Sequence, residues 1–212
     1  MKVIGINGSP RRTKNTATML EHALKGAAAQ GAETELIHLF DLKFTGCKSC
    51  FHCKRLGGNY IGKCVLKDDL KEVLEKIFEA DALVVASPIY YHDVTGAVRN
   101  LFERLWFPGN LYSADGSIAY TKRMKVGLIY TMGVPNVDKF QYTSMFERHK
   151  SIFEQYFGET QIITSLDAYQ FDDYSKYTSS AFDPIKKKER YETEFPKDCE
   201  NAVRLGEWLV EK

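Results

Sequence analysis

Residues 2–16 read KVIGINGSPRRTKNT, in which an apolar run, a turn signal and a polar stretch follow one another. A short apolar run that ends in Asn-Gly-Ser-Pro is typical of a buried strand entering a tight turn. The next apolar residues recur at helical spacing, at Met19, Leu20, Ala23, Leu24 and Ala27. The chain therefore opens as strand, loop and helix.

The same alternation continues along the chain. The pattern predicts strands at residues 33–39, 82–86, 125–131 and 162–166, and helices at 69–80, 98–106 and 140–157. Alternating strands and helices with short connections imply right-handed βαβ units and a doubly wound parallel sheet. We expect a flavodoxin-like α/β fold, with five parallel strands in a three-layer α/β/α arrangement.

Length and composition fit one domain over residues 1–212. Within it we expect a Cys-bearing loop insertion at 43–66, an extended excursion at 170–195 and a closing helix at 196–212. The charged run at 186–190 is interpreted as solvated surface.

The charge balance argues against some classes of partner. Because 29 Lys and Arg face 28 Asp and Glu, composition gives no reason to expect a nucleic-acid or anionic-membrane partner. The first residues lack a signal-peptide pattern, and no apolar run reaches the ~20 residues that span a bilayer. We therefore expect a cytoplasmic protein whose ligand sites are local.

Residues 8–16 form the first of three loops expected at the carboxyl ends of the strands, where open α/β sheets bind ligands. The loop joins a buried strand to a helix N-terminus, whose unpaired N–H groups and positive dipole end accept an anion. Ser9, Asn15 and Thr16 add neutral donors, and Arg11 can pair with phosphate. Neither the Walker pattern nor Gly-x-Gly-x-x-Gly is present, so the loop indicates a phosphate-monoester site.

The second and third loops are expected beside the first. Residues 87–96 place proline and aromatic side chains after a buried strand, which suits a rim for a flat heteroaromatic ring. Packing of those tyrosines on a neighbouring element is the alternative. Residues 131–135 contain small residues that let the backbone approach a ligand. His92 and Asp93 are interpreted as solvated residues or rim contacts and not as a proton relay.

Four short segments, taken together, resemble the NAD(P)H-dependent FMN reductase and iron-sulfur flavoprotein group of the flavodoxin-like superfamily. They are Gly8–Arg11, Asn15-Thr16, Ser87–Tyr90 and Asn100–Arg104. The likeness covers roughly residues 1–166. It implies non-covalently bound FMN that takes hydride from NADH or NADPH and passes electrons to a flavin, quinone, nitro compound or redox protein. It also implies a homodimer or homotetramer.

The resemblance further implies which residues bind FMN. Because the flavin itself accepts hydride, no acid–base side chain is named as catalytic. The implied contacts are Ser9, Arg11, Asn15 and Thr16 for the phosphate, with Pro10 in the same loop, Pro88, Ile89, Tyr90 and Tyr91 for the ring, and Thr131, Met132 and Gly133 on its third side.

Four of the five cysteines lie in one segment, at Cys47, Cys50, Cys53 and Cys64. The triplet spacing suits thiolate ligation of an Fe–S cluster, with zinc and free or redox-active thiols as alternatives. Iron-sulfur flavoproteins carry such a triplet with a fourth Cys shortly after it. The resemblance therefore implies a 4Fe-4S cluster on these four residues, although Cys64 follows a longer gap than usual. Lys48, Lys54 and Arg55 are expected to favour the thiolate form.

Two other functional classes stay open. One is an electron carrier that holds FMN without turning over a nicotinamide, and the other is a thiol or metal redox sensor. The net charge of +1 favours the reductase, because carrier flavodoxins are typically strongly acidic. Tyr169, Tyr174 and Tyr177 motivate the hypothesis that the 170–195 excursion covers the flavin.

Overall fold

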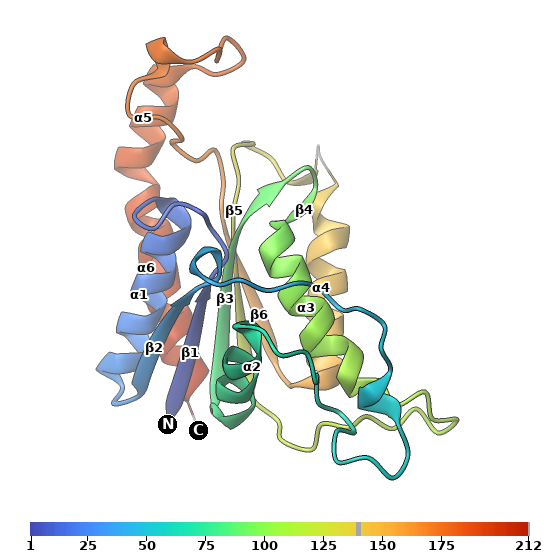
Figure 1. Ribbon diagram of the computed structural model, residues 1–212. Helices are drawn as coiled ribbons and strands as arrows, with labels where there is room; N and C mark the ends of the chain where they lie inside the picture. Colours follow the sequence, from blue (N-terminus) through green and yellow to red (C-terminus); the bar gives the residue numbers. More distant parts are fainter. Residues whose placement is uncertain (139–140, 212) are drawn as a thin grey trace.

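The computed structural model describes residues 1–138 and 141–211, and a five-stranded parallel sheet runs through its centre (Figure 1). The strand order is β2-β1-β3-β5-β6, which is the flavodoxin-like order. The fold predicted from the sequence is therefore confirmed. The strands are β1 (Lys2–Asn7), β2 (Glu33–His38), β3 (Ala82–Tyr90), β5 (Lys125–Thr131) and β6 (Thr160–Ser165).

Strand β3 is longer than the sequence pattern predicted. It continues past Ala86 to Tyr90 and turns back into the short antiparallel strand β4 (Asp93–Val94). Pro88 is tolerated here because β1 pairs only as far as Ala86, so that beyond this point β3 has only β5 on its parallel side. Part of the expected second loop is therefore strand.

The described part of the chain contains six α-helices, five of which cover the two faces of the sheet (Figure 1). Helices α2, α3 and α4 cover one face, and α1 and α6 cover the opposite one. Helix α5 lies beyond the carboxyl edge. Their bounds are α1 (Asn15–Ala29), α2 (Leu70–Glu79), α3 (Gly96–Gly109), α4 (Tyr142–Tyr156), α5 (Pro184–Thr193) and α6 (Phe195–Val210). Residue 140, where the fourth helix was expected to start, lies outside the described residues.

The core consists of two layers, one on each face of the sheet. In β3, Leu83 and Val85 pack with α2, α3 and α4, whereas Val84 packs with α1 and α6. On the second face the helices touch backbone to backbone, because a Cβ added at Gly206 would collide with the carbonyl oxygen of Ala23. This alternation of side chains explains why β3 reads as a continuous apolar run.

The C-terminal excursion is more regular than expected. It contains a short 3-10 helix at Tyr174–Lys176 and the ten-residue helix α5, so the prediction of an extended segment over 170–195 was wrong. Helix α5 forms because the Asp183 carboxylate accepts hydrogen bonds from the N–H groups of Ile185 and Lys186. Pro184 occupies the first turn, where it is tolerated.

None of the helices in residues 1–138 and 141–211 is long and apolar enough to span a membrane.

The Cys-bearing insertion has little regular structure. It leaves β2 through a 3-10 turn at Leu39–Asp41, runs along the outside of α3 and contains one further 3-10 helix at His52–Lys54 (Figure 1).

Candidate functional site

The three loops predicted to bind FMN meet at the carboxyl edge of the sheet and are hydrogen-bonded to one another. Gly8 donates its N–H to the carbonyl of Ala86 at 2.8 Å, and the hydroxyl of Thr95 donates to the carbonyl of Gly8 at 2.9 Å. The hydroxyls of Thr16 and Thr131 lie 2.7 Å apart. The first loop is thus joined to the second and to the third.

The first loop has the properties of an anion site. Ser9, Asn15 and Thr16 are buried at the start of α1, whereas Pro10 and Arg11 are exposed. In the described part of the chain, no side chain caps the helix and no acidic residue stands in its first turn. The free N–H groups and the positive dipole end there favour a phosphate, so these residues fit the group that the sequence implied.

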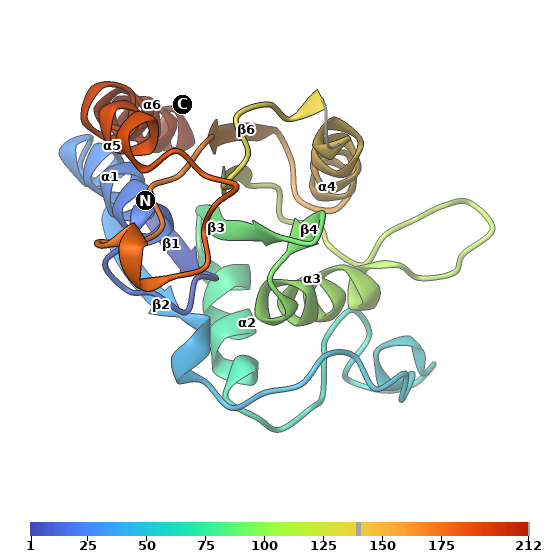
Figure 2. The ribbon, with the colours of Figure 1, turned by 90° about the horizontal axis from the view of Figure 1, so that it is seen from above.

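The segment after β6 lies across this loop (Figure 2). The guanidinium of Arg11 donates to the carbonyl of Gln170 at 2.7 Å, and the amide of Asn15 donates to that of Tyr169 at 3.4 Å. The ammonium of Lys14 lies 2.5 Å from a carboxylate oxygen of Asp172. Two of the predicted phosphate ligands, Arg11 and Asn15, therefore contact residues 169 and 170, where the C-terminal excursion begins.

The second loop separates into a buried and an exposed part. Pro88 and Ile89 are buried inside β3, whereas Tyr90 is half exposed and Tyr91 is fully exposed. Tyr91 and His92 form the turn between β3 and β4 with φ of 46° and 69°. Non-glycine residues rarely adopt this left-handed conformation, and such residues cluster at functional sites. Contact of these residues with a flavin ring stays a prediction.

The third loop is packed against the same excursion. Thr131 and Met132 are buried, and a Cβ at Gly133 would collide with the amide nitrogen of Gln170. The absence of a side chain at Gly133 therefore allows Gln170 to lie directly on the loop. Sequence reasoning did not identify Gln170, because no local motif marks it.

A buried histidine of α4 lies next to the β3–β4 turn on its inner side. Nδ1 of His149 lies 2.9 Å from the hydroxyl of Tyr130, and Nε2 lies 3.5 Å from a carboxylate oxygen of Asp93. Burial lowers the pKa of His149 to about 4, against the opposing effect of Asp93. Asp93 thus faces inward to His149 and is not only a rim contact, as the sequence had suggested, while the ring of His92 lies near Tyr142.

The Cys-bearing loop is fastened at both ends by Arg104. Its guanidinium is buried, lies 2.6 and 2.7 Å from the two carboxylate oxygens of Asp68 and donates to the carbonyls of Thr45 and Leu66. Nε of the same residue lies 3.3 Å from Sγ of Cys64. Arg104 therefore connects the start of the loop to its end.

Other residues of α3 hold the first cysteine. The backbone N–H of Cys47 donates to the carboxylate of Glu103 at 3.2 Å. A Cβ at Gly46 would lie too close to both Asn100 and Glu103. The Asn100–Arg104 segment, quoted above only for its resemblance, thus also has a structural role, because the cysteine loop packs against it.

The four thiols do not form a ligand set in this arrangement. Within the described residues, no three His, Cys, Asp or Glu side chains lie close enough together to hold a metal ion. Cys53 is buried, Cys50 is exposed, and Cys64 contacts Arg104. The donor chemistry suits an iron-sulfur cluster, but these positions do not fit one without rearrangement of the loop.

The expected activation of the thiols is also corrected at Cys53. Burial raises the pKa of the Cys53 thiol, and Lys54 opposes this only in part. The ammonium of Lys54 is bound instead by the carbonyls of Phe107, Pro108 and Asn110. It therefore anchors the loop to the end of α3.

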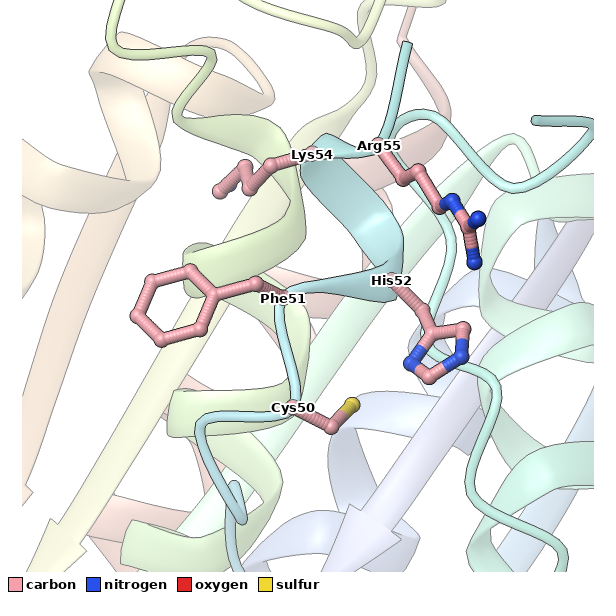
Figure 3. Close-up of a pocket in the computed structure, with 5 residues that line it drawn as sticks. All are labelled: Cys50, Phe51, His52, Lys54 and Arg55. Atoms are coloured by element: carbon pink, nitrogen blue, oxygen red, sulfur yellow. The ribbon is translucent and has the colours of Figure 1, made fainter. Parts of the chain in front are cut away.

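Figure 3 shows the side chains around the 3-10 helix at 52–54. Phe51 and Lys54 point to one side, toward α3, whereas Cys50, His52 and Arg55 point to the other. These five residues line a cavity of about 350 Å³. A second cavity of about 720 Å³ lies between this loop, α2 and residues 119–124. Neither cavity is lined by the three loops predicted to bind FMN. The C-terminal excursion lies on the first of these loops.

Sequence comparisons place the chain among flavin enzymes. A family model described as NADPH-dependent FMN reductase matches residues 1–134, more than half of the chain. An iron-sulfur flavoprotein of Methanocaldococcus jannaschii is 38% identical over 63% of this chain and 62% of its own length. One of Archaeoglobus fulgidus is 43% identical over 49% of this chain and 48% of its own. The matched segments thus span about half to three-fifths of these relatives.

Solved structures with low sequence identity share the fold. A structure described as NAD(P)H:quinone oxidoreductase from Methanothermobacter marburgensis has a TM-score of 0.64 at 17% identity, covering 100% of this chain and 97% of its own. A Bacillus anthracis azoreductase has a TM-score of 0.69 at 12% identity, covering 98% and 99%. With the extent of the family match, these findings show that the chain belongs to the NADPH-dependent FMN reductase family.

Proposed function

We propose that the protein is an FMN-dependent oxidoreductase that takes hydride from NADH or NADPH and passes electrons to a flavin, quinone, nitro compound or redox protein. The observation that carries the proposal is the junction of three loops at the carboxyl edge, fixed by the Thr95–Gly8 and Thr16–Thr131 hydrogen bonds. This edge is where doubly wound sheets bind nucleotides.

The side chains have separate tasks in this function. The start of α1, with Ser9 and Asn15, supplies donors for the phosphate, and Arg11 supplies a positive charge. The exposed rings of Tyr90 and Tyr91 give the heteroaromatic ring an apolar wall. The bound flavin accepts the hydride, so the protein's part is to position it and to exclude water.

Purification without oxygen, followed by a flavin assay and titration with NADH and NADPH, tests the proposal. We expect yellow protein whose flavin absorbance is bleached rapidly by at least one of the two nicotinamides. Protein that neither contains nor takes up FMN would overturn the flavin assignment. Flavin that binds but stays oxidised in the presence of both nicotinamides would overturn the reductase assignment and leave a carrier.

A matched pair of variants tests the site itself. Thr16→Val keeps the shape of the side chain but removes the hydroxyl that joins the first loop to the third. Thr18→Val makes the same change two residues along the same helix. We expect the FMN dissociation constant to rise about fivefold or more in the first variant, for the loss of a buried hydrogen bond, and to stay unchanged in the second. Equal affinities would contradict the assigned location.

A second candidate, an FMN electron carrier that also holds an iron-sulfur cluster, is favoured by the names of the relatives from M. jannaschii and A. fulgidus. Cys47, Cys50, Cys53 and Cys64 are the proposed ligands. Iron and acid-labile sulfide measured on the anaerobic protein test this. About four irons per chain would support a 4Fe-4S cluster, and less than one would remove it.

The proposed assembly is a homodimer or homotetramer. The fully exposed ring of Tyr91, at the tip of the β3–β4 turn, is apolar surface that a second subunit would cover. Sedimentation equilibrium of the wild type and of Tyr91→Ser measures this directly. A wild type that remains monomeric at high concentration would contradict the assembly.

A further inference from the structure

Lys187 is a buried cation next to the flavin loops. It belongs to the charged run that read as solvated surface, yet its side chain is only 4% exposed. The neighbouring Lys188 has a side chain that is 64% exposed. Burial of an ammonium group is costly unless it is paired and hydrogen-bonded, so this lysine requires a structural explanation.

All three N–H donors of the Lys187 ammonium have acceptors. The nearest is a carboxylate oxygen of Asp167 at 2.5 Å, followed by the carbonyl oxygens of Gly133 at 3.2 Å and Ala168 at 3.3 Å. The ammonium also lies 4.7 Å from the ring centre of Phe182. One group thus binds the third flavin loop and the segment that leaves β6.

The two backbones that Lys187 joins are also hydrogen-bonded directly. The N–H of Asp167 donates to the carbonyl of Val134, and that of Ala168 donates to the carbonyl of Met132, both at 2.9 Å. Asp167 itself has a left-handed backbone, with φ of 50°. This turn sends the following residues, 169–172, over the first loop.

Within this segment, Gln170 contacts both the first and the third of the loops predicted to bind FMN. Its carbonyl accepts from Arg11, and its carboxamide nitrogen lies against Gly133. Its side-chain oxygen is buried and has no hydrogen-bond partner within residues 1–138 and 141–211. A buried amide oxygen without a donor is costly, and a bound ligand with an N–H or O–H group would relieve that cost.

We propose that residues 167–172, fixed by Lys187, form a fourth wall of the flavin site and that Gln170 hydrogen-bonds the flavin. This inference rests on the proposed binding of FMN. Lys187 acts as a positioning residue, because its contacts are with Asp167 and with the backbone of residues 133 and 168, and the amide of Gln170 supplies the contact with the ligand. The flavin has ring N–H groups and ribityl hydroxyls that can donate to it.

The test compares Lys187→Met with Lys188→Met and adds Gln170→Leu. FMN affinity is measured by quenching of flavin fluorescence, apo-protein stability by thermal unfolding, and accessibility of residues 167–190 by limited proteolysis with and without FMN. We expect the dissociation constant to rise about tenfold or more for Lys187→Met and about fivefold for Gln170→Leu. Lys188→Met should match the wild type. FMN should protect the segment from proteolysis in the wild type and less so in Lys187→Met.

Wild-type FMN binding is measured first, so failure of the proposed function is recognised before the variants are compared. If the wild type binds FMN and both Lys187→Met and Gln170→Leu bind it equally well, the fourth wall is wrong. A lower melting temperature of Lys187→Met with unchanged affinity would likewise reduce the lysine to a purely structural role. Should Lys187→Met fail to fold, Gln170→Leu decides the question. The side-chain oxygen of Gln170 has no hydrogen-bond partner in the described residues, so its removal breaks no hydrogen bond of the apo-protein.

Discussion

Two segments lie outside the alternating strands and helices, and a buried cation contributes to holding each of them in a different way. Arg104 projects from α3, an element of the main fold, and binds both ends of the cysteine loop. Lys187 projects from the C-terminal excursion itself and binds back to Asp167 and to Gly133. The two ends of the cysteine loop are thus held by a residue of another element, in addition to the Lys54 anchor within the loop, whereas the excursion is held by one of its own residues.

The consequence differs for the middle of each segment. Between its two ends the cysteine loop carries exposed residues, among them Cys50, Phe51 and Leu56. The excursion lies instead on the flavin loops, through the contacts of Arg11 with Gln170 and of Lys14 with Asp172. Ligand chemistry in the first segment therefore requires rearrangement, whereas the second already contacts its proposed site.

Replacement of Arg104 should have the largest effect on stability. Arg104→Met leaves the Asp68 carboxylate and two carbonyl oxygens without their shared donor. Removing one partner of a buried ion pair costs about 3–5 kcal/mol, and we expect the free energy of unfolding in urea to fall by that amount. Arg99→Met is the control on the same helix, because Arg99 makes an exposed pair with Glu103 worth less than about 1 kcal/mol.

Equal losses in the two variants would contradict the role of Arg104 in fastening the loop. Accessibility of the thiols sharpens the comparison. We expect Arg104→Met to release the end of the loop that carries Cys64 and so to make its sulfur, which now contacts the guanidinium at 3.3 Å, more accessible to a thiol reagent. Arg99→Met should leave the rate of that reaction unchanged.

Sequence periodicity was sufficient to predict the main fold. The continuous apolar run at 82–86 reflects a strand that is buried on both faces, and the helical stripe after Asn15 reflects a helix that is buried on one face. Local sequence patterns record both kinds of burial. The predicted end of this strand at residue 86 was wrong, because Pro88 is tolerated where β3 has no neighbour on the β1 side. The rule that proline interrupts strands is weakest at such an edge.

The two buried cations could not be identified from local sequence. Arg104 was visible within a motif, but its partners Thr45 and Asp68 lie 59 and 36 residues away. Lys187 stands between two exposed lysines, so composition gave the wrong answer. The Asp183-Pro184 pair, however, is an N-cap followed by a proline in the first turn, and it could have predicted α5.

The β3–β4 turn is held by a neutral buried group, which makes it sensitive to acid, unlike the two cationic contacts. His149 is fully buried, and burial lowers its pKa from 6.5 to about 4. Between these two pH values His149 binds a proton in the unfolded chain but not in the folded one. The free energy of unfolding is therefore highest above pH 6.5 and falls as the pH is lowered toward 4. The whole loss amounts to about 3 kcal/mol.

Urea unfolding of the wild type and of His149→Gln across this pH window measures the effect. Asp93 raises the pKa of His149, whereas Arg148 and Arg99 lower it, and all three remain in the variant. The difference in stability between the two proteins should therefore shrink as the pH falls. A difference that stays constant with pH would show that His149 does not titrate in this way.

The smallest expected effect concerns the start of α5, on which the position of Lys187 depends. Asp183→Ala removes the side chain that accepts hydrogen bonds from Ile185 and Lys186, which costs about 1 kcal/mol of helix stability. Asp183→Asn is the matched control, because asparagine caps a helix about as well as aspartate.

Since the excursion is held by its own Lys187, local loosening of α5 should spread to its other contacts. Hydrogen exchange should therefore quicken in 185–193 and also in 167–172 for the alanine variant alone. Faster exchange restricted to 185–193 would mean that residues 167–172 are held without Lys187, and the contrast with the externally fixed cysteine loop would disappear.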